Sequence, residues 1–181
     1  MTIGAEVSGL SQSSITSEHL GQWVESFRGP LVGLIASWGP DWAQAEEIAA
    51  DSFAEAWMGR ARFAGDPSDL DAVGAWLRGI AMNLFRSSRR ARRALRAVPA
   101  DLPMEPEPEE DERQELLRRA FTELRQEHQN ILRMYYLEET GTEQVAALLG
   151  LSRKATENRL YQARKALREK VAVQGSTEVK L

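Results

Sequence analysis

Residues 141–167, GTEQVAALLGLSRKATENRLYQARKAL, contain two apolar runs with helical spacing, separated by a break at residues 150–152. Two helices that meet at a steep angle need a small residue at their contact, a residue that can leave helical geometry at the turn, and apolar residues on both sides. The stretch supplies Ala146 for close approach, Gly150 for the turn, Ser152 as N-cap of the second helix, and Val145, Leu149, Leu151 and Leu160 as the apolar clamp. It therefore predicts a helix-turn-helix.

The second helix of this motif has a polar and basic outer face. Residues 153–170 contain seven bases and two acids, a net charge of +5. Side chains of Arg, Asn, Gln and Glu can address base edges, and Arg and Lys can neutralise phosphates. The predicted DNA contacts are Arg153, Lys154, Glu157, Asn158, Arg159, Tyr161, Gln162, Arg164 and Lys165. A helical hairpin with a solvated charged face is the alternative, but the coincidence of glycine turn, N-cap and basic helix favours DNA binding.

Composition indicates an all-α protein without an enzymatic site. Ala, Leu, Arg and Glu dominate the 181 residues, and runs of strand-forming residues are scarce. The absence of cysteine excludes disulfides and thiolate zinc sites, and the two histidines, His19 and His128, are isolated. No phosphate-loop motif occurs, so we expect no cofactor and no metal. The longest apolar stretch, LVGLIASW, is far shorter than the roughly 20 residues of a membrane span, so we expect a cytoplasmic protein without membrane insertion.

The net charge of −4 conceals a segregation of charge along the chain. Six arginines and no acid lie in residues 86–96, whereas seven acids, no base and several prolines lie in residues 101–112. The proline-rich acidic segment predicts a flexible linker between two small helical domains. The expected boundaries are a tail at 1–17, a first domain at 18–96, the linker at 97–112, a helix-turn-helix domain at 113–172 and a tail at 173–181.

Three helices are expected in the first domain. An apolar stripe from residue 20 to 38 is interrupted by Gly29 and Pro30, which predicts a kink or a break. A second helix is expected over 42–62. Ser68 and Asp69 are N-cap candidates for a third helix that begins with an apolar stripe and ends with arginines on one face.

Beyond these patterns, three stretches resemble a known family. EETGTEQVAALLGLSRKATENRLYQARKALRE resembles the minus-35-reading domain of bacterial RNA polymerase sigma factors, and AEEIAADSFAEAWMGRARF followed by VGAWLRGIAMNLFRSSRRARR resembles their core-binding and minus-10-melting domain. Two such domains joined by a short linker resemble the extracytoplasmic-function class, over residues 20–170. The resemblance implies a sigma factor that binds core RNA polymerase and directs initiation at two promoter elements about two helical turns apart.

The resemblance also implies roles for residues of the first domain. Read alone, the acidic row Glu47, Asp51 and Glu55 indicates a solvated helix face or, as the alternative, a face that binds a basic partner. In the family, this helix docks on the clamp of the largest polymerase subunit, so the implied core-binding residues are Glu46, Glu47, Ala50, Asp51, Phe53 and Glu55. The loop at 64–70 and the helix after it would capture a flipped base and hold the opened strand. The implied minus-10 contacts are Phe63, Gly65, Asp66, Trp76, Arg78, Asn83, Arg86, Arg89, Arg90 and Arg93.

The implied partners are core RNA polymerase, through its largest-subunit clamp and its flap, promoter DNA and an anti-sigma factor. Three positions depart from the family pattern: Ala50 stands where Gln is common, Ser87 where Asp is common, and Glu157 where Lys or Arg is common. Glu157 predicts an unusual minus-35 preference, because a carboxylate accepts from cytosine but repels phosphate. The alternative function is a helix-turn-helix regulator that acts without being a polymerase subunit, which dimerisation on a palindromic site would favour.

Overall fold

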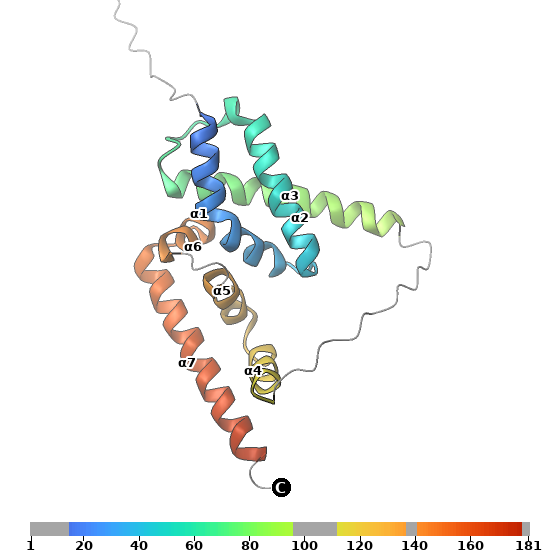
Figure 1. The fold of residues 1–181 in the computed structure, drawn as a ribbon, viewed down its shortest axis with the longest axis vertical. Coiled ribbons are helices and arrows are strands. Elements are labelled where there is room, and N and C mark those ends of the chain that lie inside the picture. Colours follow the sequence, from blue (N-terminus) through green and yellow to red (C-terminus); the bar gives the residue numbers. More distant parts are fainter. Residues whose placement is uncertain (1–14, 96–111, 137–140, 179–181) are drawn as a thin grey trace, which may run out of the picture.

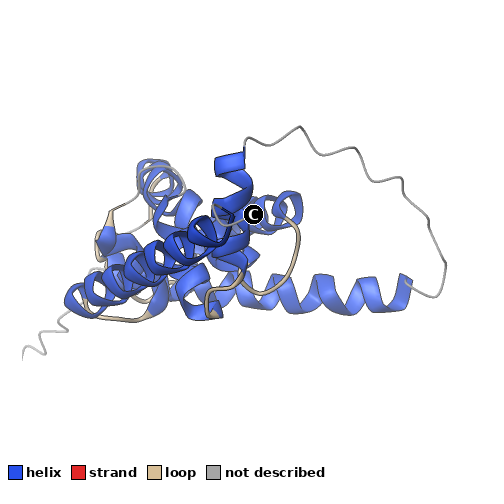
Figure 2. Ribbon diagram, turned by 90° about the horizontal axis from the view of Figure 1, so that it is seen from below, coloured by secondary structure: helices blue, strands red, loops and turns tan. Residues whose placement is uncertain are grey.

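The computed structural model describes residues 15–95, 112–136 and 141–178, and every regular element in these ranges is helical (Figures 1 and 2). The α-helices are α1 (Ser17–Ala36), α2 (Trp42–Met58), α3 (Leu70–Leu95), α4 (Glu112–Thr122), α5 (Gln126–Tyr136), α6 (Thr142–Leu149) and α7 (Arg153–Glu178). This architecture confirms the predicted all-α class. None of the described helices is long and apolar enough to cross a membrane.

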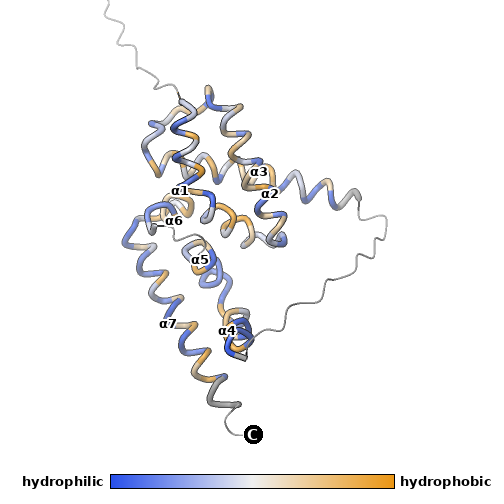
Figure 3. Tube along the Cα trace, viewed as in Figure 1, coloured by the Kyte–Doolittle hydropathy of each residue, from blue (hydrophilic) through white to orange (hydrophobic). Residues whose placement is uncertain are grey.

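Helix α1 begins at a reciprocal cap and runs through Pro30 without ending. The His19 backbone N–H donates to Thr16 Oγ1 at 3.4 Å, while the Thr16 N–H donates to His19 Nδ1 at 3.1 Å. Because Pro30 has no N–H, one helical hydrogen bond is missing there, and the ribbon changes direction partway along α1 (Figure 1). The sequence predicted either a kink or a break at Gly29 and Pro30, and the structure shows a continuous helix. Its second half is among the most hydrophobic parts of the trace (Figure 3).

Two helix ends differ from the sequence-based expectation. Helix α2 ends at Met58, and a short 3-10 turn, Arg60–Arg62, replaces the last turn of the helix expected over 42–62. Helix α7 continues to Glu178, so the tail expected at 173–181 is wrong for its first six residues. Lys170 and Gln174 both bind Glu123, at 2.9 and 2.8 Å, and these contacts hold the end of α7 against the short connection between α4 and α5.

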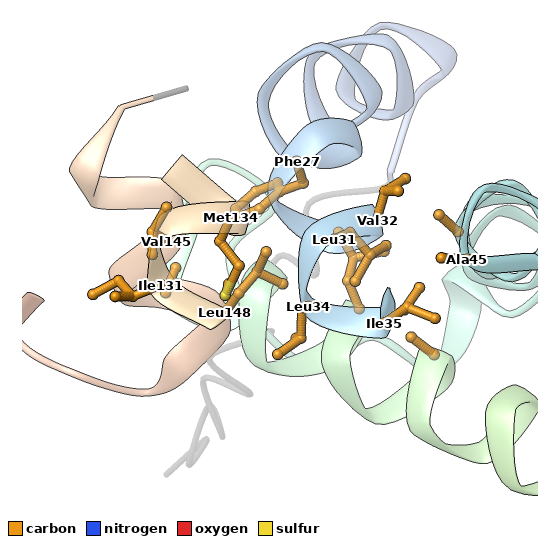
Figure 4. Packing of buried hydrophobic residues seen from close by; sticks show 14 of the residues in the cluster. Phe27, Leu31, Val32, Leu34, Ile35, Ala45, Ile131, Met134, Val145 and Leu148 are labelled. Carbon is orange, nitrogen blue, oxygen red and sulfur yellow. The ribbon is translucent and has the colours of Figure 1, made fainter. Parts of the chain in front are cut away.

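The two expected domains pack against each other. Helices α5 and α6 contact α1, and α6 also contacts α3, so one hydrophobic core extends through both halves of the chain. Figure 4 shows Met134 and Leu148 beside the α1 residues Phe27 and Leu31, with Val145 farther from α1, and all five side chains are fully buried. The sequence predicted two domains but gave no sign of this packing. Residues 97–111 of the expected linker lie outside the described residues, and its last residue, Glu112, begins α4.

Two glycines bring helix backbones into direct contact across this junction. A Cβ atom added at Gly33 of α1 would lie 2.9 Å from the Met134 Cα of α5. A Cβ atom added at Gly74 of α3 would lie 2.7 Å from the Ala147 Cβ and 2.8 Å from the Ala147 carbonyl carbon of α6. Only glycine fits at these two positions while the helices keep their spacing.

Candidate nucleic-acid interface

The turn between α6 and α7 has the geometry expected of a helix-turn-helix. Gly150 adopts a left-handed conformation, with φ 66° and ψ 39°, and the Leu151 N–H donates to the Ala146 carbonyl at 3.0 Å. Ser152 then caps α7, because its Oγ accepts from the Ala155 N–H at 3.2 Å. Both local predictions, the glycine turn and the serine cap, are confirmed.

Helix α7 has a buried and an exposed face. Thr156, Leu160 and Ala163 lie in the interior. Eight of the nine predicted minus-35 contacts are exposed: Arg153, Lys154, Glu157, Asn158, Arg159, Tyr161, Gln162 and Lys165. The outer face therefore presents cations and amides together, which suits contacts to phosphates and to base edges.

Arg153 links the two helices of the motif. Its Nη1 donates to Glu143 Oε1 of α6 at 2.8 Å, and its Nε donates to Glu157 Oε1 at 2.9 Å. The hydrogen bond from Glu157, followed by the charge of Glu143, raises the pKa of Arg153 above its usual value. All three side chains are more than half exposed, so these ion pairs are weak and can exchange for contacts to phosphate.

Arg164 differs from the other eight predicted contacts because it binds α5. Its Nε donates to Tyr136 Oη at 2.9 Å, and its guanidinium lies 4.9 Å from the ring centre of Tyr135. Next to it, an apolar groove of about 950 Å³ lies between α4, α5 and α7. Leu117, which is 50% exposed, and Tyr161, which is 58% exposed, line this groove. The sequence did not reveal the groove, since Leu117 follows the same apolar stripe as buried residues.

The first domain contains an aromatic cluster under the predicted base-capturing loop. The ring centres of Phe63 and Trp76 are 4.8 Å apart, and Trp23 lies 5.8 and 5.9 Å from them. The buried Trp23 Nε1–H donates to the Pro67 carbonyl at 2.9 Å. These contacts attach the loop to α1, a connection between distant segments that the sequence did not indicate.

The loop itself is shaped by two aspartates and one glycine. Asp66 Oδ1 accepts from Ser68 Oγ at 2.6 Å and from the Ser68 N–H at 2.9 Å, and these hydrogen bonds lower the pKa of Asp66. Asp69 Oδ1 accepts from the Asp71 N–H at 2.9 Å and so caps α3. A Cβ atom added at Gly65 would lie 2.9 Å from the Phe63 ring. The loop conformation therefore depends on a glycine at 65.

A hollow of about 350 Å³ opens beside this cluster. It brings together Trp76 and Asn83, both predicted to face the opened strand, with Arg62 and Glu55. Arg62 was not among the predicted contacts. The sequence analysis placed it at the end of a helix over 42–62, whereas it lies in the 3-10 turn that follows α2. An aromatic face, an amide and a cation in one hollow can stack on a base and bind its edge.

The arginines of α3 fall into two groups. Arg86, Arg89 and Arg90 are exposed on the part of the helix that projects from the bundle (Figures 1 and 2), while the Arg93 side chain lies outside the described residues. Arg78 is partly buried instead, and its Nη1 would lie 3.3 Å from a Cβ atom added at Gly150. One predicted minus-10 contact thus lies against the turn of the helix-turn-helix.

Helix α2 carries all six predicted core-binding residues, of which four are exposed, Glu55 is half-buried and Phe53 is buried. Glu46, Glu47, Ala50 and Asp51 are exposed, and Glu46 lies 3.9 Å from Arg28. Phe53 is only 7% exposed and packs in the core, so its assignment to the binding surface is wrong. It faces inward because the helical stripe that includes Ile48 and Ala49 also includes position 53.

Comparison with known proteins decides the family. A model described as Sigma-70 region 2 matches residues 23–95, and one described as Sigma-70, region 4 matches residues 114–167. The chain belongs to the sigma-70 family. The helix-turn-helix of this sigma-70 protein lies in its region 4, and the aromatic cluster, the hollow and the acidic helix α2 lie in its region 2.

The chain is also similar to individual proteins and solved structures. This sigma-70 protein is 36% identical over 143 residues to "Probable RNA polymerase sigma factor RfaY" of Xanthomonas campestris pv. campestris, covering 72% of the chain and 35% of that relative. It thus spans about a third of the relative's length. A structure of CnrH in complex with the cytosolic domain of CnrY is 26% identical, with a TM-score of 0.50 and coverage of 87% and 90% of the two chains. A co-crystal structure of the sigma factor RpoE with the anti-sigma factor NepR from Bartonella quintana is 18% identical. Its TM-score is 0.45, and the match covers 87% of this chain and 94% of that chain.

Proposed function

We propose that this sigma-70 protein is a sigma factor of the extracytoplasmic-function class, which binds core RNA polymerase and directs initiation by reading a minus-10 and a minus-35 element. The observation that carries the proposal is that one chain presents two different surfaces suited to contacts with bases. The exposed face of α7 suits duplex DNA, whereas the hollow at Trp76 and Asn83 suits an unpaired base.

Each surface has a defined part in this proposal. The arginines of α3 attract phosphates without regard to sequence, which brings the chain onto the duplex. Side chains of α7 read base edges of the minus-35 element in the major groove. Flipping a base from the minus-10 element costs a few kcal/mol of stacking and pairing, which the hollow and nearby cations offset.

Core polymerase would be held through the exposed acidic surface of α2, made of Glu46, Glu47 and Asp51. Such a surface fits a basic partner, and the resemblance identifies that partner as the clamp of the largest subunit, with the flap as a further contact. Ala50, in the middle of this surface, provides no polar contact. The resemblance to the extracytoplasmic-function class adds an anti-sigma factor to the proposed partners.

Run-off transcription on pooled genomic fragments, with purified core polymerase and with or without this protein, tests the proposal. New transcripts that start at a fixed distance from a shared two-part motif are expected. A protein that does not bind core polymerase but binds a palindromic site as a dimer would instead be a helix-turn-helix regulator.

Asn158→Ala is expected to weaken binding to the minus-35 element by roughly 1–3 kcal/mol, because an asparagine amide can make a bidentate contact to a base edge. Affinity would be measured for the assembled polymerase on promoter duplexes with intact and scrambled minus-35 elements. Asn130→Ala, on α5 and off the predicted surface, is the control. Equal discrimination between the two duplexes in wild-type protein and in Asn158→Ala would remove Asn158 from the contacts.

A further inference from the structure

We propose that the triad Glu143, Arg153 and Glu157 selects one G·C base pair of the minus-35 element, and that Glu143 is the positioning residue of this triad. The inference deepens the proposed function and rests on it. It names the base pair that the start of α7 selects, and it gives a role to Glu143 of α6, which is not among the predicted DNA contacts.

The triad lies where a recognition helix meets base edges. In a helix-turn-helix, the N-terminal residues of the second helix contact the bases. Arg153 is the first residue of α7, and Glu157 lies about one turn further along the same exposed face. Glu143 extends from the other helix of the motif, so the guanidinium of Arg153 is held from both helices.

The hydrogen bonds of the triad hold Arg153 while most of its donors stay available. Its Nη1 donates to Glu143 at 2.8 Å, and its Nε donates to Glu157 at 2.9 Å. A guanidinium has five N–H donors, so three remain for DNA. Each exposed ion pair is weak in water, but the lower dielectric of a groove from which water is excluded strengthens both.

The triad presents donors beside an acceptor, and this pattern is the complement of a G·C base pair. In the major groove, guanine shows two acceptors, N7 and O6, beside the N4 donor of cytosine. Arg153 can donate to both acceptors while Glu157 accepts from N4. The spacing also fits, because Arg153 Nε and Glu157 Oε1 are 2.9 Å apart, and O6 and N4 are joined by a hydrogen bond of similar length.

The other three base pairs do not complement this pattern. In A·T and T·A, the N6 donor of adenine lies between two acceptors, so one acceptor would face the carboxylate of Glu157. In C·G, the order of groups is reversed, and the cytosine donor would face the donors of Arg153. Glu143 excludes this reversed reading, because it keeps Arg153 on the α6 side of Glu157.

Selection of promoter duplexes by the assembled polymerase tests the proposal. The duplexes carry a randomised minus-35 element in a promoter found by run-off transcription, and those that bind core polymerase with wild-type or variant protein are sequenced. For the wild type, we expect one position at which G·C is preferred about tenfold or more over each other pair. Glu157→Gln should lose most of this preference, because an amide donates as well as accepts, and should keep the preferences at other positions.

Glu143→Gln separates a positioning role from a structural one. Loss of the carboxylate charge loosens Arg153 without removing a DNA contact, so the G·C preference at that one position should fall about three- to tenfold. This fall should disappear in an Arg153→Gln background, where Glu143 has nothing to position. A purely structural effect would lower affinity for all sequences alike. Glu127→Gln, which removes one exposed carboxylate from α5, is the matched control and should change no preference.

The outcomes separate the two proposals. If the G·C preference stays intact in Glu157→Gln, the triad does not select the pair; if it stays intact in Glu143→Gln, Glu143 is not a positioning residue. If Arg153→Gln lowers the salt dependence of binding but changes no preference, Arg153 contacts phosphate instead. If the wild-type protein with core polymerase enriches no minus-35 sequence at all, the proposed function itself fails.

Discussion

Leu148→Ala is expected to lower the free energy of unfolding by about 2–5 kcal/mol, because it leaves a cavity at a fully buried position where α6 packs against the first domain. In a chain of this size, a loss of that extent lowers the melting temperature by roughly 4–20 °C. The change in the free energy of unfolding is measured by urea unfolding, followed by circular dichroism and by tryptophan fluorescence. The two probes together also show whether the two domains unfold as one.

The tryptophans all belong to the first domain, and of them Trp42 also lines the groove between α4, α5 and α7. All five tryptophans lie between Trp23 and Trp76, whereas Leu148 is in region 4. If both domains share one core, fluorescence and circular dichroism should shift together in Leu148→Ala. Leu117→Ala makes the same change at a half-exposed position, so it should shift neither the fluorescence transition nor the circular dichroism transition by much. A fluorescence transition that is unmoved by Leu148→Ala would show that the first domain is stable without the second.

Replacement of Arg86, Arg89 and Arg90 by Gln is expected to reduce the salt dependence of promoter binding. Each phosphate contact contributes about 0.9 to the slope of log affinity against log salt concentration, so three lost contacts lower the slope by about 3. The three side chains are exposed on the projecting part of α3. Because contacts to phosphate carry no sequence information, affinity should fall by a similar factor for all promoter sequences. The measurement is a salt titration of the assembled complex.

A variant with the same change in charge separates local contacts from net charge. Replacement of Arg113, Arg118 and Arg119 on α4 by Gln also removes three positive charges, but outside the proposed DNA surfaces. An equal loss of slope in both triple variants would show that overall charge, not the end of α3, sets the salt dependence.

Local features of this protein could be predicted from the sequence because their causes are local. Gly150 is needed for the left-handed turn, Ser152 caps the next helix, and residue spacing alone separates the outer face of α7 from Leu160 and Ala163. The end of α2 was placed too late, since nothing at Gly59 distinguishes a helix end from a tolerated glycine.

Features that depend on distant segments could not be predicted. Gly33, Gly74 and Gly79 look alike in the sequence, yet two of them contact another backbone and the third faces open space. Arg78 and Arg164 belong to basic runs, but their positions against Gly150 and Tyr136 follow from how helices pack. The hollow that contains Arg62 has the same origin, because its lining comes from α2, the turn after it and α3.

The hydrogen bond from Trp23 to the Pro67 carbonyl has an evolutionary consequence. A backbone carbonyl is present whatever the side chain, so a mutation at the exposed Ala64 leaves this attachment to α1 intact. Gly65 is constrained by its contact with Phe63, and Asp66 and Ser68 are constrained by the hydrogen bonds between them. If the loop captures a base as proposed, paralogues can diverge in the base they select through exposed loop positions such as Ala64, while inheriting the same attachment to α1.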